Sequence, residues 1–233
     1  MATALIVLQA RFRSQRLPGK ALADLAGRPV LARCLDRLRM SCAAPVVLAT
    51  TTRADDDALV AVALDRGVPV VRGPEDDVLA RFVMAVARFG ASYAVRATAD
   101  NPFVDIDAPR RVLEALVAWG ADHVVEAGLP YGAGVEAVTA AALRKADLLA
   151  REASDREHVT TYIRRSQRFA AVEIDAPAPL RHPDLRLTVD TPEDLEFARA
   201  VMAQLAGAAG EPSLSSVIGA AYALMPALSE VVR

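Results

Sequence analysis

The sequence predicts an α/β fold in which a mostly parallel sheet is covered by helices on both faces. Short runs rich in valine and isoleucine alternate along the chain with longer stretches whose apolar residues recur at helical spacing. Three of the first four helical stretches end on or just before a glycine, at Gly67, Gly90 and Gly120, which is a common helix stop. This alternation is typical of parallel sheets, because parallel neighbours need a crossover connection that is usually a helix.

The first half of the chain supplies four strands and four helices. The expected strands are apolar runs of the fully buried kind, at residues 4–10, 45–50, 93–98 and 122–127. The expected helices occupy residues 29–40, 55–67, 76–90 and 107–120. Helices therefore separate all four strands, so we expect the strands to run in one direction.

The alternation weakens after residue 127. The pattern there predicts a loop then a strand over 128–138, helices at about 139–152 and 155–166, and strands at 169–177 and 185–190. A helix over 191–207 has a clear start, with Thr191 as its cap, Pro192 in its first turn and Asp194 three residues after the cap. A short linker at 207–213 leads into a last apolar helix. We expect one domain over 1–233 with an inserted or appended substrate-side segment at about 127–184.

The composition indicates a soluble cytoplasmic protein. The 233 residues are 53% hydrophobic and carry a net charge of −2, so the basic field of a nucleic-acid-binding protein is not expected. The first apolar run is too short for a signal peptide or a membrane span, and no membrane partner is expected. The spacing of Cys34 and Cys42 suggests neither a disulfide framework nor a zinc site, and both are expected to be inert thiols in a reducing compartment.

A basic loop, "QARFRSQRLPGKAL" (9–22), follows the first strand. It carries four cations within ten residues, Arg11, Arg13, Arg16 and Lys20. Ligands bind open parallel sheets beyond the carboxyl ends of the strands, and Pro18-Gly19 allows a tight turn whose amides can face a ligand. The loop is therefore either a polyphosphate cradle or a solvated surface loop. Its spacing matches neither the P-loop nor the dinucleotide-binding motif.

The segment 9–38 resembles the opening signature of the cytidylyltransferase family that includes CMP-sugar-acid synthetases and spore-coat polysaccharide proteins. Similar segments follow in family order, "RGPEDDVLARF" (72–82), "RATADNPFVD" (96–105), "GVEAVTAAAL" (134–143), "REHVTTYIRR" (156–165) and "RLTVDTPEDLEFAR" (186–199). The resemblance implies a three-layer fold of the nucleotide-diphospho-sugar-transferase, Rossmann-like type. It also implies transfer of CMP from CTP to a small anionic acceptor (a sugar acid, phosphate or phosphonate), with Mg²⁺ as cofactor and release of pyrophosphate.

The resemblance assigns nucleotide-binding roles to five residues of the basic loop, Arg11, Arg13, Ser14, Arg16 and Lys20. Arg11, Arg16 and Lys20 would hold the triphosphate and stabilise the departing pyrophosphate, because guanidinium and ammonium groups bind phosphate oxygens strongly. Arg13 replaces the small residue that many relatives carry. It either adds a phosphate contact or points outward.

Two aspartates follow predicted strands, Asp100 in "TADNP" and Asp190 in "LTVDTP". The resemblance implies that they coordinate Mg²⁺ and that Asp100 is catalytic; carboxylate oxygens suit that ion. Without the resemblance, both would be explained as turn or helix-start residues. It further suggests that Asp77 and Arg81 lie near the base and ribose, although the acids of "EDDV" also suit the first turn of a helix. Arg96 stands in an otherwise buried strand and needs a partner, an internal carboxylate or a phosphate.

Three residues match family positions that face the acceptor, Glu136, Arg156 and His158. The Arg-Glu-His run at 156–158 equally fits a surface ion cluster. Tyr131-Gly134 departs from the family pattern, so we expect an acceptor pocket of different shape or charge. Two alternatives to the transferase remain, a glycosyltransferase-like enzyme that binds a nucleotide-sugar and a non-catalytic nucleotide-binding protein. A homodimer is possible, with the last apolar helix either at its interface or in the core.

Overall fold

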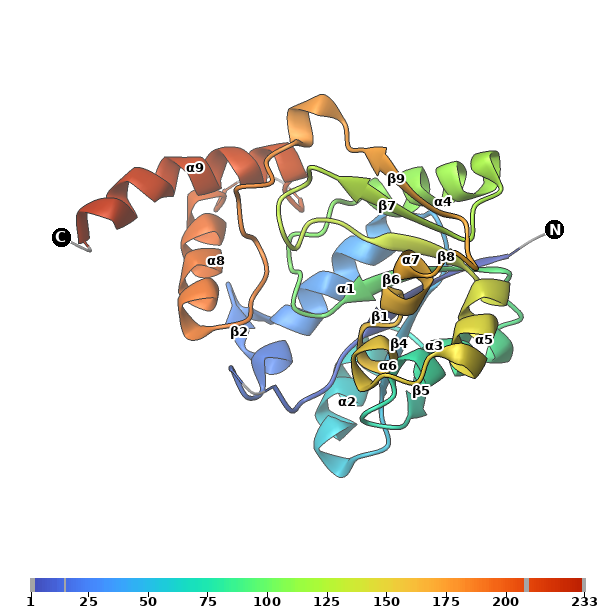
Figure 1. The fold of residues 1–233 in the computed structure, drawn as a ribbon. Helices are drawn as coiled ribbons and strands as arrows, with labels where there is room; N and C mark the ends of the chain where they lie inside the picture. Colours follow the sequence, from blue (N-terminus) through green and yellow to red (C-terminus); the bar gives the residue numbers. More distant parts are fainter. Residues whose placement is uncertain (1–2, 15, 208–209, 232–233) are drawn as a thin grey trace.

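A computed structural model describes residues 3–14, 16–207 and 210–231. Its main sheet has seven strands in the order β5-β4-β1-β6-β8-β7-β9 (Figure 1). The strands are β1 (Ala4–Gln9), β4 (Val46–Thr51), β5 (Val70–Gly73), β6 (Tyr93–Thr98), β7 (His123–Ala127), β8 (Glu136–Thr139) and β9 (Ala171–Asp175). A separate two-stranded hairpin joins β2 (Asp24–Leu25) to β3 (Arg28–Pro29).

The helices connect and cover these strands. They are α1 (Val30–Met40), α2 (Asp57–Asp65), α3 (Val78–Arg88), α4 (Ala108–Trp119), α5 (Ala140–Leu149), α6 (Ala153–His158), α7 (Thr161–Arg165), α8 (Pro192–Gln204) and α9 (Leu214–Val231). Three short 3₁₀ turns add to them, η1 (Lys20–Leu22), η2 (Ala54–Asp56) and η3 (Ala178–Leu180).

The sheet is mostly parallel, as the sequence predicts. Strands β5, β4, β1 and β6 pair in parallel, and so do β7 and β9. Strand β8 is antiparallel to both of its neighbours, β6 and β7. Its first residue, Glu136, therefore pairs with Arg96, near the carboxyl end of β6. This reversal brings Glu136 to the edge of the sheet where ligands bind parallel α/β folds.

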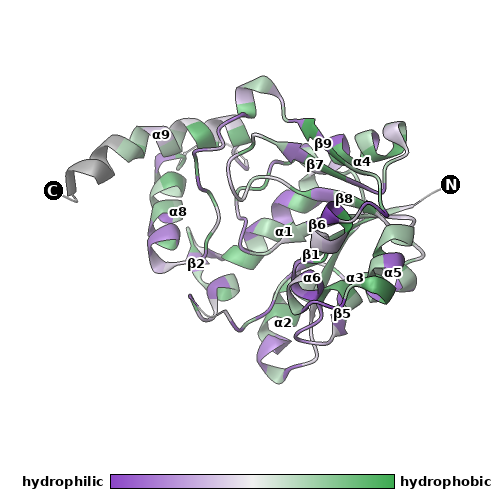
Figure 2. Cartoon of the chain, in the orientation of Figure 1, coloured by the Kyte–Doolittle hydropathy of each residue, from purple (hydrophilic) through white to green (hydrophobic). Residues whose placement is uncertain are grey.

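Two hydrophobic cores, one on each face of the sheet, make the fold three-layered. Successive residues of β1 point to opposite faces, so Ile6 and Leu8 enter one core while Leu5 and Val7 enter the other. The first core is completed by buried residues of α1, α2, α4, α8 and α9, and the second by those of α3, α5 and α7. Figure 2 shows the apolar colouring on the helices that flank the sheet. The predicted α/β class is confirmed.

The end of the chain forms two helices. Helix α8 begins as predicted: the Thr191 side chain accepts from Asp194 N, Asp194 accepts from Thr191 N, and Pro192 opens the helix. In α9, Leu214, Val217 and Ala221 are buried, so its first half belongs to the core, while its far end extends beyond the other elements (Figure 1). Within the described ranges, no helix combines the length and apolar character needed to span a bilayer. The homodimer stays a prediction.

Two local features were missed, and one predicted strand was wrong. Strand β5 and the β2–β3 hairpin were not predicted, because they comprise only four and two-plus-two residues. Residues 185–190 were predicted as a strand but make a single bridge, Tyr131 to Arg186. Leu185, Leu187 and Val189 are buried apolar residues that alternate in sequence with the polar residues Arg186, Thr188 and Asp190, which imitates a strand pattern without a ladder.

The helix predicted over 155–166 is broken into α6 and α7. Val159, between them, has φ +64° and ψ −58°, and Thr160 N donates to His158 O over 2.6 Å. These values define a γ-turn of the rare, strained kind. The sequence pattern does not reveal this break, because Val159 and Ile163 lie four residues apart and are both fully buried, as they would be in one continuous helix.

Candidate functional site

One polar cavity of about 700 Å³ lies beyond the carboxyl ends of β1 and β6. The basic loop forms one wall, α3 and the start of β8 form another, and the segments 129–135 and 157–164 close it. Most of the predicted site residues line it: Arg11, Arg13, Ser14, Arg16, Lys20, Arg81, Arg96, Asp100, Glu136, His158 and Asp190. Asp77 and Arg156 are not among the lining residues.

Each of the four loop cations has a carboxylate partner. Arg11 binds Glu157 over 2.7 Å, and Arg13 binds Asp55 over 2.9 Å. Arg16 approaches Asp190 to 3.2 Å, and Lys20 lies between Asp100 and Asp190. Carboxylates thus offset the like-charge repulsion that such clustering causes. Arg13 contacts Asp55 and also lines the cavity, and a phosphate contact by this residue stays a prediction.

Asp56 holds the start of the loop in place, a role that the sequence did not reveal. Its carboxylate accepts from Phe12 N, from Thr50 Oγ1, and from both the backbone and the hydroxyl of Thr51, all within 2.9 Å. Burial alone would raise the pKa of Asp56, but the hydrogen bonds from Thr51, Phe12 and Thr50 outweigh it and lower that pKa. In the sequence Asp56 is one of three successive aspartates, so nothing marked it out.

Lys20 sits between the two predicted metal ligands. Its Nζ lies 2.8 Å from Asp100 Oδ2 and 2.8 Å from Asp190 Oδ1. Burial alone would lower the pKa of Lys20, but Asp100 and Asp190 outweigh it and raise that pKa. Burial alone would raise the pKa of Asp190, whereas Lys20, Arg186 and Arg16 lower it. At neutral pH the Lys20 ammonium and the Asp190 carboxylate are therefore charged.

The position between Asp100 and Asp190 fits a cation. The two carboxylates offer hard oxygen atoms to one point, and in this structure an ammonium group takes that point. In the described part of the chain, no group of three or more histidine, cysteine or acidic side chains could hold a metal ion. A pair of carboxylates is nevertheless enough for Mg²⁺ when substrate phosphates supply further ligands.

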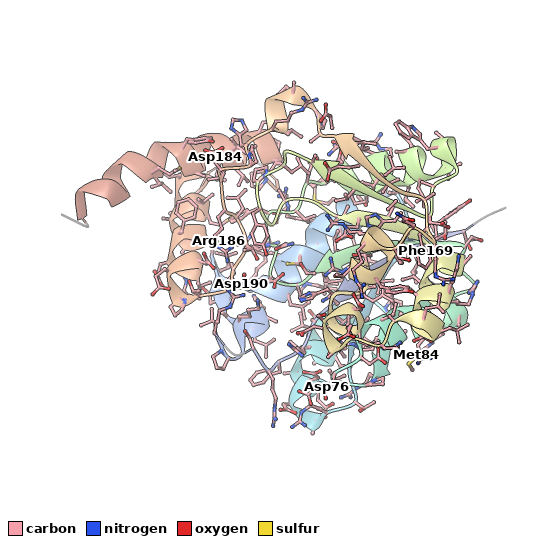
Figure 3. All side chains as sticks on the ribbon, in the orientation of Figure 1. Asp76, Met84, Phe169, Asp184, Arg186 and Asp190 are labelled. Atoms are coloured by element: carbon pink, nitrogen blue, oxygen red, sulfur yellow. The ribbon has the colours of Figure 1, made fainter. Side chains whose placement is uncertain are left out.

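The segment before α8 keeps Asp190 in place. Arg186 binds Asp190 over 2.8 Å and Asp194 through two contacts of 3.0 and 3.1 Å (Figure 3 labels Arg186 and Asp190). Val189 N and the Thr188 hydroxyl donate to Asp100 O, which links the two aspartates through the backbone. Asp194, predicted as an acid at the helix start, thus also orients the arginine that holds Asp190.

Arg81 is a buried guanidinium at the inner wall of the cavity. Its side chain is 1% exposed, and its Nε and Nη1 atoms have no hydrogen-bond partner within the described residues. Its stem lies against Gly73, where an added Cβ would come within 2.9 Å of Arg81 Cγ. Burial, followed by the charge of Arg11, lowers the pKa of Arg81 to about 10. A buried cation without hydrogen-bond acceptors is costly, which favours an anionic ligand at this point.

Glu136 lies in a buried network that joins three elements. Its Oε1 accepts from Arg96 Nη1 over 2.6 Å, and its Oε2 contacts His123 Nε2 over 2.7 Å and Thr160 Oγ1 over 2.6 Å. The partner that Arg96 was expected to need is therefore an internal carboxylate. Arg96 Nε still has no partner in the described ranges, and Arg96 lines the cavity. His123 Nδ1 is also buried without a hydrogen-bond partner among the described residues.

The Glu136 carboxylate is expected to stabilise the fold. Burial alone would raise its pKa, but His123, Arg96 and Thr160 outweigh it and lower the pKa of Glu136 from 4.5 to about 2. The stabilisation is present above the unfolded-state pKa and is lost as pH falls through the folded-state value. We expect Glu136→Gln to cost on the order of 3 kcal/mol at pH 7, because a shift of one pKa unit corresponds to about 1.4 kcal/mol.

Urea unfolding at neutral pH and at several lower pH values, down to about 2, measures this effect. The difference in unfolding free energy between wild type and Glu136→Gln should shrink steadily as pH falls below about 4.5. Glu173→Gln, on the exposed surface of β9, is the matched control and should leave stability unchanged at every pH. A difference that is constant with pH would mean that the charge of Glu136 is not the stabilising feature.

Asp77 and Arg156 bind each other and not the cavity. Asp77 caps α3 by accepting from Ala80 N, and Arg156 donates to it through Nε and Nη2. Arg156 also binds Asp147, at the end of α5. The pair therefore joins α6 to the start of α3, and the predicted nucleotide and acceptor roles of these two residues stay predictions.

The far wall of the cavity is formed around α6 and α7. His158 is exposed and lines the cavity, together with Glu157 and Arg164. Arg164 was not predicted, because its place in "YIRR" gives no signal in the sequence. Glu126, which also lines the cavity, was missed as well, and Arg111 neutralises it through contacts of 2.5 and 2.9 Å.

The atypical segment at 131–134 forms one rim of the cavity. Tyr131 is 61% exposed, and the Arg186 guanidinium lies 5.0 Å from its ring centroid, a cation–π contact. Gly132 has φ +95°, and an added Cβ would come within 2.7 Å of Thr188 N, so only glycine allows this close approach. The departure from the family pattern thus has a structural basis, because this rim is packed against the segment that carries Asp190.

Comparison with solved structures gives the class of the fold. A cytidylyltransferase from Leptospira borgpetersenii superposes with a TM-score of 0.85 at 25% identity, covering 98% of this chain and 96% of its own. A CMP:2-keto-3-deoxy-manno-octonic acid synthetase in complex with CTP has the same fold, with a TM-score of 0.65 at 18% identity over 88% of this chain and 100% of its own. The fold is that of the Rossmann-like nucleotidyltransferases.

Sequence comparison gives the family. Residues 5–211 match the family model described as cytidylyltransferase. The spore coat polysaccharide biosynthesis protein SpsF of Bacillus subtilis is 36% identical over 221 residues, 92% of each chain. The 3-deoxy-manno-octulosonate cytidylyltransferase of Anaeromyxobacter dehalogenans is 28% identical over 85% of this chain and 97% of its own. The chain belongs to the cytidylyltransferase family.

Proposed function

We propose that this protein transfers CMP from CTP to a small anionic acceptor, with release of pyrophosphate and with Mg²⁺ as cofactor. The observation that carries the proposal is the Lys20, Asp100 and Asp190 cluster, which faces a cavity lined by Arg11, Arg16 and further cations. Polyphosphate binding needs such cations, and metal-assisted phosphoryl chemistry needs carboxylates beside them. Membership of the cytidylyltransferase family supports the same reaction.

The reaction needs positioning and charge stabilisation more than a protein nucleophile. An acceptor oxygen attacks the α-phosphorus of CTP, the bond between the α-phosphorus and the bridging oxygen breaks, and pyrophosphate leaves with that oxygen. A carboxylate, phosphate or phosphonate oxygen has no proton to lose in this step, whereas a sugar hydroxyl would release its proton to solvent water as the new P–O bond forms. Arg11, Arg16 and Lys20 would exchange their present carboxylate partners for triphosphate oxygens, and so stabilise the charge that develops on the leaving group.

Asp100 and Asp190 would hold the Mg²⁺ ion. When bound, the ion supplies positive charge beside the phosphate oxygens. Lys20 now contacts both aspartates, so its ammonium group would leave this point and turn to the triphosphate. The buried Arg81 would add a charged donor on the opposite wall.

The second substrate belongs to the other half of the cavity, around Arg96, His158 and Arg164. Two relatives act, by name, on 3-deoxy-manno-octulosonate and in spore coat polysaccharide synthesis. A sugar acid or another small anion on the way to a polysaccharide is therefore the acceptor class that we propose. We place the reaction in the cytoplasm.

Pyrophosphate release tests the proposal. The purified chain is mixed with each of the four ribonucleoside triphosphates, with and without Mg²⁺, and with a panel of sugar acids, sugar phosphates and phosphonates. Release is expected with CTP, Mg²⁺ and one acceptor class, together with a product whose mass is that of the acceptor plus CMP. Tight CTP binding without release for any pair would indicate a non-catalytic nucleotide-binding protein. Sugar transfer from a nucleotide-sugar would instead indicate the glycosyltransferase-like alternative.

A further inference from the structure

The turn between α6 and α7 is held by a side chain outside the cavity. Thr160 occupies the cap position of α7, where a threonine hydroxyl usually accepts from the helix backbone. Its side chain makes no such bond and donates instead to Glu136 Oε2 over 2.6 Å. Thr160 is 2% exposed and is not among the residues that line the cavity. The hydroxyl therefore connects α7 to strand β8.

This connection secures a strained backbone. Val159, directly before Thr160, has a positive φ that branched residues rarely adopt, and Thr160 N closes the γ-turn onto His158 O. Strain of this kind persists only where the surroundings fix the conformation. The Thr160–Glu136 bond and the complete burial of Val159 both contribute to fixing it here.

The strained turn determines where three cavity residues lie. Glu157 and His158 come immediately before Val159, and Arg164 follows one helical turn after Thr160. Glu157 in turn binds Arg11 of the basic loop. A relaxed turn would therefore move the wall that faces the second substrate, while Lys20, Asp100 and Asp190 would keep their own contacts.

We propose that Thr160 is a positioning residue for the acceptor: through Glu136, it holds the 157–164 wall in the geometry that receives the second substrate. This inference rests on the proposed function, because it concerns the acceptor half of the same cavity. Glu136 then acts mainly on protein groups, since its two oxygens already accept from Arg96, His123 and Thr160.

Two substitutions of Thr160 and one of its neighbour separate positioning from simple destabilisation. Thr160→Val removes the hydroxyl and keeps the branched shape, whereas Thr160→Ser keeps the hydroxyl. Thr161→Val is the matched control, because Thr161 follows directly and lies outside the Glu136 network. With the best acceptor from the panel above, Thr160→Val is expected to raise the acceptor KM by about tenfold or more, the loss that follows from one hydrogen bond to a charged group. The KM for CTP should change by less than about threefold, and Thr160→Ser should restore the acceptor KM.

Amide hydrogen exchange of the free protein gives a second reading that needs no substrate. In Thr160→Val, amides of residues 158–165 should exchange faster, while those of β1 and β6 keep wild-type protection. Equal losses for CTP and acceptor, or failure of serine to restore the acceptor KM, would overturn the proposal. If the wild type releases no pyrophosphate, the proposed function fails by itself, and unchanged exchange at 158–165 would then overturn the positioning role.

Discussion

Replacing either Asp100 or Asp190 by asparagine is expected to lower pyrophosphate release by about a hundredfold or more, because each is expected to supply charge to one metal ion. The double variant should be little worse than either single variant, since residues that act as a unit are strongly non-additive. Magnesium titration in the presence of CTP provides the measurement. Asp175→Asn is the control, because Asp175 also ends a strand, β9, but lies outside the cavity.

The two variants should differ in stability. Asp190 is 6% exposed and faces Lys20, Arg16 and Arg186, so Asp190→Asn leaves a half-buried group of cations with less compensating charge. Asp100→Asn leaves Lys20 with Asp190, and its melting temperature should fall less. Repulsion between two close carboxylates would by itself predict little loss of stability or even a gain. The ammonium between them reverses that expectation. Wild-type activity and magnesium dependence in both variants would show that these acids have only structural roles.

Replacing Arg81 by methionine is expected to change stability and nucleotide binding in opposite directions. The variant removes a buried charge that lacks hydrogen-bond acceptors, so the free energy of unfolding should rise by on the order of 1–3 kcal/mol. CTP binding should weaken by at least about a hundredfold, because two charge-assisted contacts of about 1.5–3 kcal/mol each would be lost. Calorimetric titration with CTP and urea unfolding measure the two effects.

Arg88→Met is the control for Arg81→Met. Arg88 lies on the same helix, α3, but on its exposed side, where it donates to Val70 O and lies over Phe89. Arg88→Met should therefore leave CTP affinity unchanged. If Arg81→Met lowers the free energy of unfolding and leaves CTP affinity unchanged, Arg81 stabilises the fold and does not bind CTP.

Apart from β5 and the β2–β3 hairpin, the strands and helices of the first half of the chain could be predicted because local pattern determines them. Strands β1, β4, β6 and β7 are apolar runs, and α1 to α4 carry apolar residues at helical spacing. The antiparallel direction of β8 could not be predicted in this way. It depends on the connection that residues 128–135 make, and no periodicity records a direction.

The candidate site likewise has a part that the sequence could predict and a part that it could not. The basic loop follows β1 and Asp100 follows β6, so their gathering at one edge was predictable. Asp190 was predicted there from a strand at 185–190, but the structure has only a single bridge in that segment. The Asp77–Arg156 pair joins residues 79 positions apart, and the sequence had assigned them to two different substrates. Asp56 and Thr160 also escaped prediction, because their importance lies in distant partners, Phe12 and Glu136, and not in neighbours along the chain.

The reversed strand β8 has a consequence for how this fold can diversify. Four parallel strands, β5, β4, β1 and β6, fix the basic loop and Asp100, while β8, β7 and β9 form a second block that is hydrogen-bonded to the first, within the described sheet, through the β6–β8 ladder. Insertions or replacements within the second block would leave the register of the first block untouched. Evolution can therefore exchange one half of the cavity while the other half is inherited unchanged.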